Sequence, residues 1–121
     1  MRTPSFSVKV CCLDARNHFE YYRNMESEDV VVALTALAQA SRLAVFRLLV
    51  QVGEEGVPAG KIAEALDIPP SSLSFHLKEL SYAGLITSRQ NGRFIIYSAN
   101  YERMRGVLGY LSDNCCNGKT C

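Results

Sequence analysis

The chain has 121 residues, a length that suits one domain with a modest hydrophobic core. Its 48% hydrophobic and 21% charged residues are typical of a globular protein, and no apolar run approaches the roughly 18 residues that suggest a membrane span. A net charge of +1 excludes a uniformly basic protein, so binding to nucleic acid would need a local basic surface. The first residues lack a secretory signal, and five cysteines is an odd number. We therefore expect a cytoplasmic protein with reduced thiols and no membrane contact.

The first 24 residues show no regular apolar period. Met25 opens the segment MESEDVVVALTALAQ, in which acidic residues precede an apolar helical pattern, as at a natural helix N-terminus. Translation that starts at Met25 would remove Cys11 and Cys12 from the native protein. We divide the chain into an N-terminal extension, a domain and a cysteine-containing tail, which cover residues 1–26, 27–113 and 114–121.

Apolar residues at helical spacing predict four helices in the first part of the domain. The first covers about residues 27–39, and Ser41 is expected to cap the second, which ends at Gly53. A short third helix covers residues 59–66, and the fourth begins at Pro70, whose missing N–H is harmless in a first turn. The first helix carries an apolar stripe, and the second has a side that is expected to be buried. The stripe consists of Val30, Val31, Leu34, Leu37 and Ala38, and the buried side of Leu43, Phe46, Leu49 and Val50.

Beyond Gly84, where the fourth helix ends, the pattern predicts a β-hairpin and a last helix. Strands are expected over residues 85–89 and 93–98, because the Asn-Gly pair between them tolerates the positive φ angles of a tight turn. The last helix covers residues 100–112 and carries a narrow apolar seam at Tyr101, Met104, Leu108 and Leu111. The expected fold is therefore mainly α with a small β-hairpin, in the order α-α-α-α-β-β-α.

The third and fourth helices, joined by a tight turn, have the dimensions of a helix-turn-helix, and the hairpin that follows resembles a wing. In the fourth helix Leu73, Leu77 and Leu80 fall on one side, which leaves the other side for DNA. The residues predicted to contact DNA are Ser71, Ser72, Ser74, Phe75, His76 and Lys78 in this helix, and Arg89 and Arg93 in the hairpin.

Each of these residue types has an alternative interpretation. Serines at the start of a helix are often only caps, and an outward-facing Phe75 would also suit a contact with a neighbouring subunit. A single histidine such as His76 is commonly a structural residue. If Phe75 does face DNA, the apolar ring suits the methyl group of a thymine.

Three segments resemble the ArsR/SmtB family of winged-helix repressors: ALAQASRLAVFRLLV, IAEALDIPPSSLSFHLKELSYAGLI and SRQNGRFIIYSAN. The resemblance covers about residues 30–112, and SLSFHLKEL followed by AGLI is its most specific part. It implies a homodimer that is joined through the first and last helices and binds double-stranded operator DNA. It also implies a repressor that leaves its operator when a metal or metalloid binds, with no enzymatic activity and no required cofactor.

The chain departs from the family pattern at three places. GVPAGKIA stands where some members carry a Cys-Val-Cys-like metalloid motif, and YERMRGVLGYLSDN has no histidine where others bind zinc on the last helix. Phe75 stands where many members have an arginine before the histidine of the recognition helix. The base preference of those relatives therefore does not transfer to this chain.

Three of the five cysteines lie in the segment NCCNGKTC at the end of the chain, beyond a body that contains none. Trivalent arsenic is soft and binds three thiolates, whereas zinc prefers four ligands, for which the chain offers only two histidines. We expect an irregular backbone after residue 114, in which Gly118 lets the tail fold back. The cluster also resembles the C-terminal arsenite site of one ArsR branch, which implies Cys115, Cys116 and Cys121 as ligands of As(III) or Sb(III).

Other triggers and other functions are compatible with the same thiols. Cadmium, lead or thiol oxidation could each be the signal that releases such a repressor from DNA. A thiol enzyme such as an arsenate reductase would need an anion-binding loop and a nearby base, which the tail lacks. A metal buffer would gain nothing from a winged-helix body. We therefore predict no catalytic residues.

Overall fold

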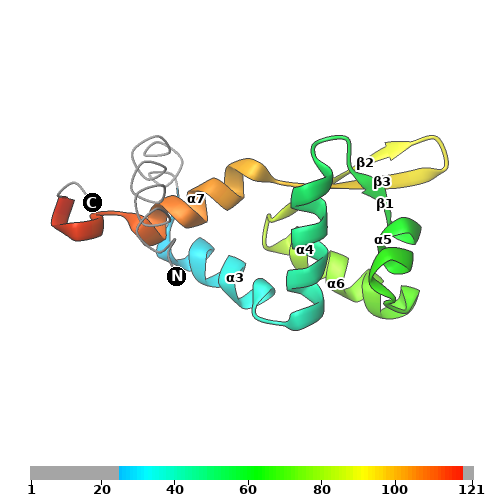
Figure 1. Ribbon diagram of the computed structural model, residues 1–121, viewed down its shortest axis with the longest axis horizontal. Coiled ribbons are helices and arrows are strands. Elements are labelled where there is room, and N and C mark those ends of the chain that lie inside the picture. Colours follow the sequence, from blue (N-terminus) through cyan, green and yellow to red (C-terminus); the bar gives the residue numbers. More distant parts are fainter. Residues whose placement is uncertain (1–24, 119–121) are drawn as a thin grey trace, which may run out of the picture. The chain divides into compact units, whose positions relative to one another are not determined.

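The computed structural model describes residues 25–118, so the predictions for Cys11, Cys12 and Cys121 lie outside the described residues. In chain order the elements are helices α3 (Ser27–Leu37) and α4 (Ala40–Val52), strand β1 (Val57–Pro58), helices α5 (Ala59–Leu66) and α6 (Pro70–Tyr82), strands β2 (Ile86–Asn91) and β3 (Phe94–Ala99), helix α7 (Tyr101–Ser112) and the 3-10 turn η1 (Cys115–Gly118) (Figure 1). They form a mainly helical winged helix-turn-helix fold with a small antiparallel sheet, as the sequence predicts.

The backbone divides into two compact units. Residues 31–101 form one unit, which holds the sheet and helices α4, α5 and α6. In the part of the chain that the structure describes, the other unit holds residues 25–30 and 102–118. Its two segments touch where the Arg103 guanidinium donates to Met25 Sδ at 3.5 Å. Within residues 25–118 no single helix is long and apolar enough to cross a membrane, although α3 and α4 taken together across their bend reach that length and apolarity.

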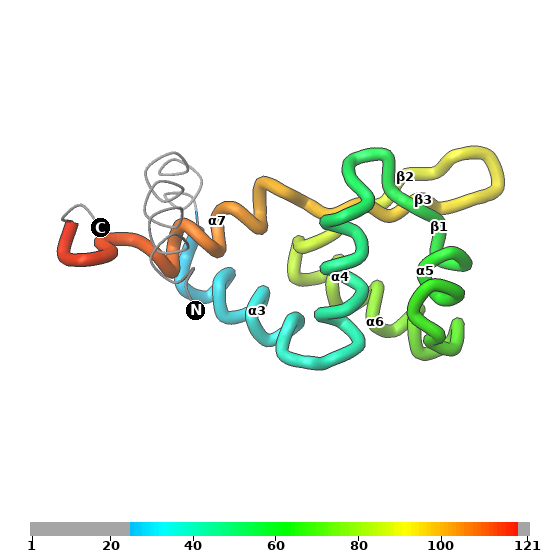
Figure 2. The backbone as a smooth tube through the Cα atoms, in the orientation of Figure 1, coloured from blue at the N-terminus to red at the C-terminus, as the bar shows by residue number. Residues whose placement is uncertain are grey.

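Helices α4, α5 and α6 pack against one another and enclose the core of the larger unit. The tube in Figure 2 shows the chain leaving α5, turning into α6 and then entering the hairpin. The bounds predicted for the third helix are those observed for α5, and α6 begins at Pro70 as expected. The largest fully buried side chains are Leu49, Ile62, Leu73, Leu80, Leu85 and Val45.

The buried side of the first two helices differs from the prediction. In α3 the core takes Val30 and two alanines, Ala33 and Ala36, because small residues let a helix pack closely. Val31 and Leu34, which belong to the predicted apolar stripe of this helix, lie outside the core, and Val31 is 61% exposed. In α4 the buried residues are Val45, Phe46 and Leu49. Leu43 was expected among them and is exposed, because this buried set turns Leu43 away from the core.

The start of α4 also corrects the prediction of Ser41 as its N-cap. The N-cap is Gln39, whose side-chain oxygen accepts a hydrogen bond of 2.9 Å from the backbone N–H of Arg42. The Arg42 side chain donates in turn to the carbonyl of Ala36 at 2.7 Å. These two bonds satisfy backbone groups at the junction of α3 and α4, which a serine two residues later does not reach.

The sheet has three strands in the order β1-β3-β2, where the sequence predicts only the hairpin. Strand β1 is two residues long and pairs with β3 through Val57 opposite Tyr97 and Pro58 opposite Ile96. The glycines and the proline around it indicate a loop, and its strand character comes from pairing with a distant segment. It ties the start of α5 to the base of the wing.

Gly56 lies directly before β1 at a very close backbone approach. Its φ of +72° is in the left-handed region, and a Cβ added there would lie 2.5 Å from Ser98 Oγ and 2.9 Å from Ile96 Cγ2. The carbonyl oxygen of Tyr97 also stands in the way. Only glycine therefore lets the loop reach β3.

We expect Gly56→Ala to lower the free energy of unfolding by about 3 kcal/mol, since it adds left-handed strain and a clash with backbone. Gly92→Ala is a matched control, because Gly92 has a φ of +64° and nothing within 4 Å of the added Cβ. It should cost only about 1 kcal/mol of strain. Urea denaturation of both variants measures the difference, and equal losses would show that the close approach is unimportant.

Candidate DNA interface and C-terminal thiol pair

The outward side of α6 carries the residues predicted to contact DNA. Helix α6 buries Leu73, Leu77 and Leu80, and this set fixes the rotation of the helix about its axis. The N-cap is Pro69, which makes no side-chain cap hydrogen bond, so no serine is the N-cap of this helix. The exposed residues of the predicted set in this helix are Ser71, Ser72, Ser74, Phe75 and Lys78.

Phe75 and His76 occupy the middle of this helix and differ in exposure. The side chain of Phe75 is 56% exposed, whereas His76 is half-buried. Their rings meet edge to face, with centroids 5.9 Å apart and an interplanar angle of 61°. His76 Nδ1 is buried and has no hydrogen-bond partner among residues 25–118. Phe75 is therefore the more exposed of the two rings, and His76 is partly covered by the protein.

The two hairpin arginines, both predicted from the sequence to contact DNA, have different surroundings. Arg89 on β2 donates to the carbonyl of Glu55 at 2.7 Å and to Ser98 Oγ at 3.5 Å. Ser98 is buried, and its hydroxyl donates to the carbonyl of Glu54 at 3.1 Å. Arg93 lies at the hairpin turn and is exposed. Arg89 thus holds the loop before β1 against the wing, and Arg93 presents its charge at the tip.

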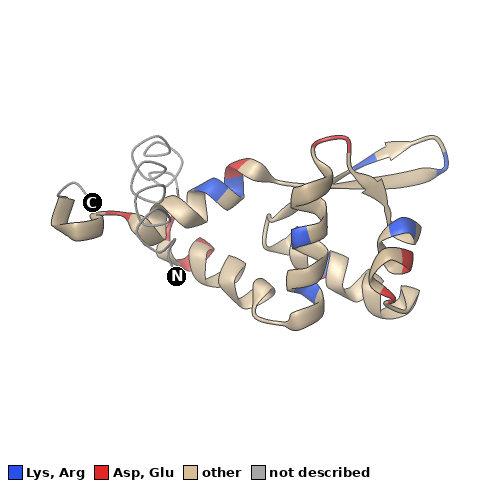
Figure 3. Ribbon diagram, in the orientation of Figure 1, with Lys and Arg blue, Asp and Glu red and all other residues tan. Residues whose placement is uncertain are grey.

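The charges of the larger unit are separated along the chain. Figure 3 shows basic residues on the hairpin and at the start of α5, and acidic residues in the loop between α4 and β1. That loop contains Glu54 and Glu55, whose backbone carbonyls receive the bonds from the wing. The Arg89 guanidinium therefore lies beside the backbone of this loop, whereas Arg93 lies at the tip of the hairpin.

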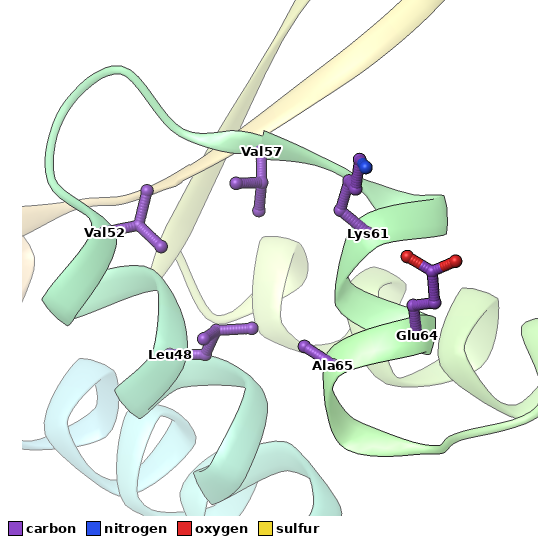
Figure 4. A pocket seen from close by; sticks show the side chains of 6 residues that line it. All are labelled: Leu48, Val52, Val57, Lys61, Glu64 and Ala65. Carbon is purple, nitrogen blue, oxygen red and sulfur yellow. The ribbon is translucent and has the colours of Figure 1, made fainter.

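An open hollow of about 350 Å³ lies between α4, β1 and α5. Figure 4 shows aliphatic side chains from α4 and β1 on one side and the Lys61 and Glu64 side chains of α5 on the other. None of the residues predicted to bind DNA or metal lines it. The lining residues are Leu48, Val52, Val57, Lys61, Glu64 and Ala65.

The C-terminal thiols follow α7 in a left-handed turn. Asn114, Cys116 and Asn117 have φ angles of 59°, 58° and 58°, so the chain after α7 is irregular, as expected. This geometry brings Cys115 Sγ and Cys116 Sγ to 3.7 Å of each other. Asparagine adopts such φ angles readily, whereas a cysteine there costs about 1 kcal/mol.

The structure thus brings together two of the three predicted metalloid ligands. Cys115 is half-buried and Cys116 is exposed. The third, Cys121, lies outside the described residues. Among residues 25–118 no group of three or more His, Cys, Asp or Glu side chains could hold a metal ion. A complete three-sulfur site therefore stays a prediction.

Comparison with known proteins supports a regulator. Residues 37–89 match a family described as a helix-turn-helix domain. The nodulation protein NolR of Rhizobium meliloti is 33% identical over 71% of this chain and 70% of its own length. The arsenical resistance operon repressor of Bacillus subtilis (strain 168) is 36% identical over 67% of this chain and 73% of its own. This chain belongs to the ArsR/SmtB family of winged-helix transcriptional repressors.

A solved structure agrees with the ArsR/SmtB assignment. The homodimeric winged helix-turn-helix DNA-binding domain of Mb0332 from Mycobacterium bovis, a possible ArsR-family regulator, superposes with a TM-score of 0.57. It is 25% identical and covers 78% of this chain and 87% of its own. Membership of a family of transcriptional regulators also supports the expectation that the chain is not an enzyme. The names of the relatives differ in what they regulate, so the family alone does not define the effector.

We expect Arg89→Ala to affect mainly the stability of this ArsR-family chain and Arg93→Ala to affect mainly its binding to DNA. Arg89→Ala loses the hydrogen bonds to the loop and should lower the free energy of unfolding by about 1–2 kcal/mol. Arg93→Ala should leave stability within about 0.5 kcal/mol and reduce by about 1 the slope of log affinity against log salt on duplex DNA. Urea denaturation and fluorescence anisotropy at several salt concentrations measure both quantities. A reversed assignment of the two effects would show that Arg89 is the phosphate contact.

Proposed function

We propose that this protein is an arsenite-responsive repressor that binds operator DNA as a homodimer and leaves it when As(III) or Sb(III) binds Cys115, Cys116 and Cys121. The observation that carries the proposal is the pair of adjacent thiols, whose sulfurs lie 3.7 Å apart directly after α7. A relative in Bacillus subtilis is described as the repressor of an arsenical resistance operon, which supports a link to arsenic.

The chemistry of the pair suits a soft, three-coordinate guest. Soft thiolates select soft ions, and two sulfurs near van der Waals contact can reach one ion without a change of backbone. A turn of six residues from Cys116 to Cys121 is short, so closing it around the ion costs little loop entropy. The glycine at position 118 has a φ of +79°, which favours a reversal of the chain towards the pair.

Exposed apolar residues on α3 and α7 support the homodimer. Leu108 and Leu111 are 52% and 58% exposed, and they belong to the seam that the sequence predicts for the last helix. Val31 and Leu34 of α3 are exposed as well. Apolar side chains at these spacings are typical of helix association, and the related domain of Mb0332 is described as homodimeric. One recognition helix from each subunit would then contact one half of an inverted repeat.

Release of DNA follows from linkage between the two sites. If arsenite binds the DNA-free dimer a hundredfold more tightly than the DNA-bound dimer, the coupling is about 2.8 kcal/mol, and DNA weakens arsenite binding by the same factor. The thiols follow the helix that carries the proposed dimer seam, so a bound ion acts on the last turn of that helix. A change in the seam alters the spacing of the two recognition helices.

We expect arsenite to release the wild-type protein from its operator and to leave Cys115→Ser and Cys121→Ser proteins bound. Loss of one thiolate removes a ligand from a three-coordinate ion, so the hundredfold drop in DNA affinity should disappear. A gel shift with the DNA upstream of the chain's own gene measures this release. A double variant, Cys11→Ser with Cys12→Ser, is the matched control and should still be released. Normal release of the Cys115 and Cys121 variants would reject the site.

Oxidation is a second candidate trigger, through a disulfide between Cys121 and Cys115 or Cys116. In that reaction two thiols give two electrons and two protons to a peroxide. Peroxide would then release the wild-type protein and a thiol reductant would restore binding, whereas release by arsenite needs no oxidant. A scan of arsenite, antimonite, cadmium and peroxide across the variants separates the triggers.

We expect Leu108→Glu with Leu111→Glu to produce a monomer, because two carboxylates cannot be desolvated in an apolar seam. The operator affinity should fall by at least tenfold, since each subunit then binds one half-site alone. Sedimentation velocity measures the oligomeric state. Ile95→Glu replaces an exposed apolar residue of the wing and should remain dimeric. A dimeric double variant would exclude α7 from the interface.

A further inference from the structure

We infer that Phe75 determines sequence specificity by contacting the C5 methyl group of one thymine in each operator half-site. The inference rests on the proposed operator binding and adds the chemical group that is read. It starts from an exposed aromatic ring in the middle of a helix side whose first two turns are otherwise small and polar. The residues of that side that follow helical spacing are Ser71, Ser74, Phe75, Lys78 and, at the end of the helix, Tyr82.

Packing of the core sets the rotation of the helix and therefore places Phe75 on this side. The buried residues Leu73 and Leu77 flank it in sequence and hold the helix so that Phe75 points away from them. The edge-to-face contact with His76 orients the ring, and His76 itself is half-buried. A ring that is held before binding loses little conformational entropy when it meets DNA.

The neighbours of Phe75 make it the first group to meet a base. Ser71 and Ser74 have short side chains, so the helix backbone can approach the groove closely and the phenyl ring projects beyond them. Lys78, one turn further along, is exposed and suits a phosphate. The helix is therefore equipped to dock on DNA with an apolar group at the centre of the contact.

A phenyl ring can discriminate among the base edges of the major groove because it cannot form hydrogen bonds with them. It has no hydrogen-bond donor or acceptor, so opposite guanine, cytosine or adenine it would leave polar groups of the base unsatisfied. Thymine offers the single apolar group in the major groove, its C5 methyl. Contact with that methyl removes both apolar surfaces from water. Phe75 therefore favours thymine at one position of each half-site.

A second subunit is the rival occupant of this position. A protein interface would surround Phe75 with other apolar residues, yet its nearest neighbours along the exposed side are two serines and a lysine, and Tyr82 lies two turns further on. Exposed aliphatic residues occur instead on α3 and α7, where the dimer is proposed. The composition around Phe75 therefore favours DNA over protein as its partner.

The test first finds the preferred duplex and then removes single methyl groups from it. Purified wild-type protein selects binding sites from a random-sequence duplex library. Each thymine of the selected half-site is then replaced by deoxyuridine, which differs only by the C5 methyl. We expect one thymine per half-site at which the replacement weakens binding about fourfold, and about fifteenfold when both half-sites are changed, as for one buried carbon each.

Variants of the two exposed aromatic residues of α6 assign the effect. Phe75→Ala should bind the thymine and deoxyuridine duplexes equally, and its own selection should lose the preference for thymine. Tyr82→Ala is the matched control, because Tyr82 ends the same helix and is 84% exposed. It should keep the fourfold discrimination. Thermal melting should show both variants folded, since neither side chain belongs to the core.

The outcomes separate this inference from the proposed function. Wild-type protein that is indifferent to every methyl, or a Phe75→Ala protein that keeps the discrimination, overturns the role of Phe75. Selection that enriches no sequence overturns operator binding and the inference together. Methyl discrimination in a protein that arsenite does not release supports the inference and rejects only the proposed trigger.

Discussion

Burial of three leucines of α6 decides what this protein can present to DNA. Leu73, Leu77 and Leu80 are buried where α6 packs on α4 and α5. Each contributes about 2–3 kcal/mol of apolar burial, so any other rotation of the helix would expose them at a cost comparable to the stability of the domain. No side-chain cap fixes the start of α6, and its first residues are one proline and two serines. The position of every outward side chain on this helix therefore depends on packing on the opposite side.

The wing is held by an arrangement of a different kind. Successive carbonyls of the loop before β1, those of Glu54 and Glu55, accept bonds from Ser98 on β3 and Arg89 on β2. The loop can come this close because Gly56 has no side chain to meet the Tyr97 carbonyl. The base of the hairpin is thus fixed by backbone proximity and polar bonds, while its tip is exposed. The Arg89 guanidinium has more N–H donors than these bonds use, so Arg89 and Arg93 both remain candidates for phosphate contact.

Local patterns in the sequence were sufficient for most elements but not for these long-range contacts. The bounds of α5 and the start of α6 follow from prolines and helical spacing, which act within a few residues. Strand β1 and the role of Arg89 depend on segments far apart in the chain, and the partners of Arg89 include a carbonyl, which every residue has. For the same reason charge alone could not distinguish Arg89 from Arg93. The approach of the two cysteine sulfurs accompanies a left-handed φ at Cys116, a conformation that a cysteine in the sequence does not predict.

The end of α7 provides a physical connection between the thiols and the proposed dimer seam. The Ser112 hydroxyl donates to the carbonyl of Leu108 at 2.8 Å, and the backbone N–H of Asp113 donates to that of Tyr110 at 3.3 Å. The last turn of α7 is therefore hydrogen-bonded up to the residues that lead into Cys115. In the proposed mechanism an ion that also binds Cys121 holds the turn in one conformation, and these bonds connect the turn to Leu108, whose side chain belongs to the proposed seam. The coupling of about 2.8 kcal/mol that a hundredfold release requires is the size of one or two such hydrogen bonds plus part of one leucine contact. A rearrangement confined to one helical turn is consequently sufficient, and the recognition helices need not unfold.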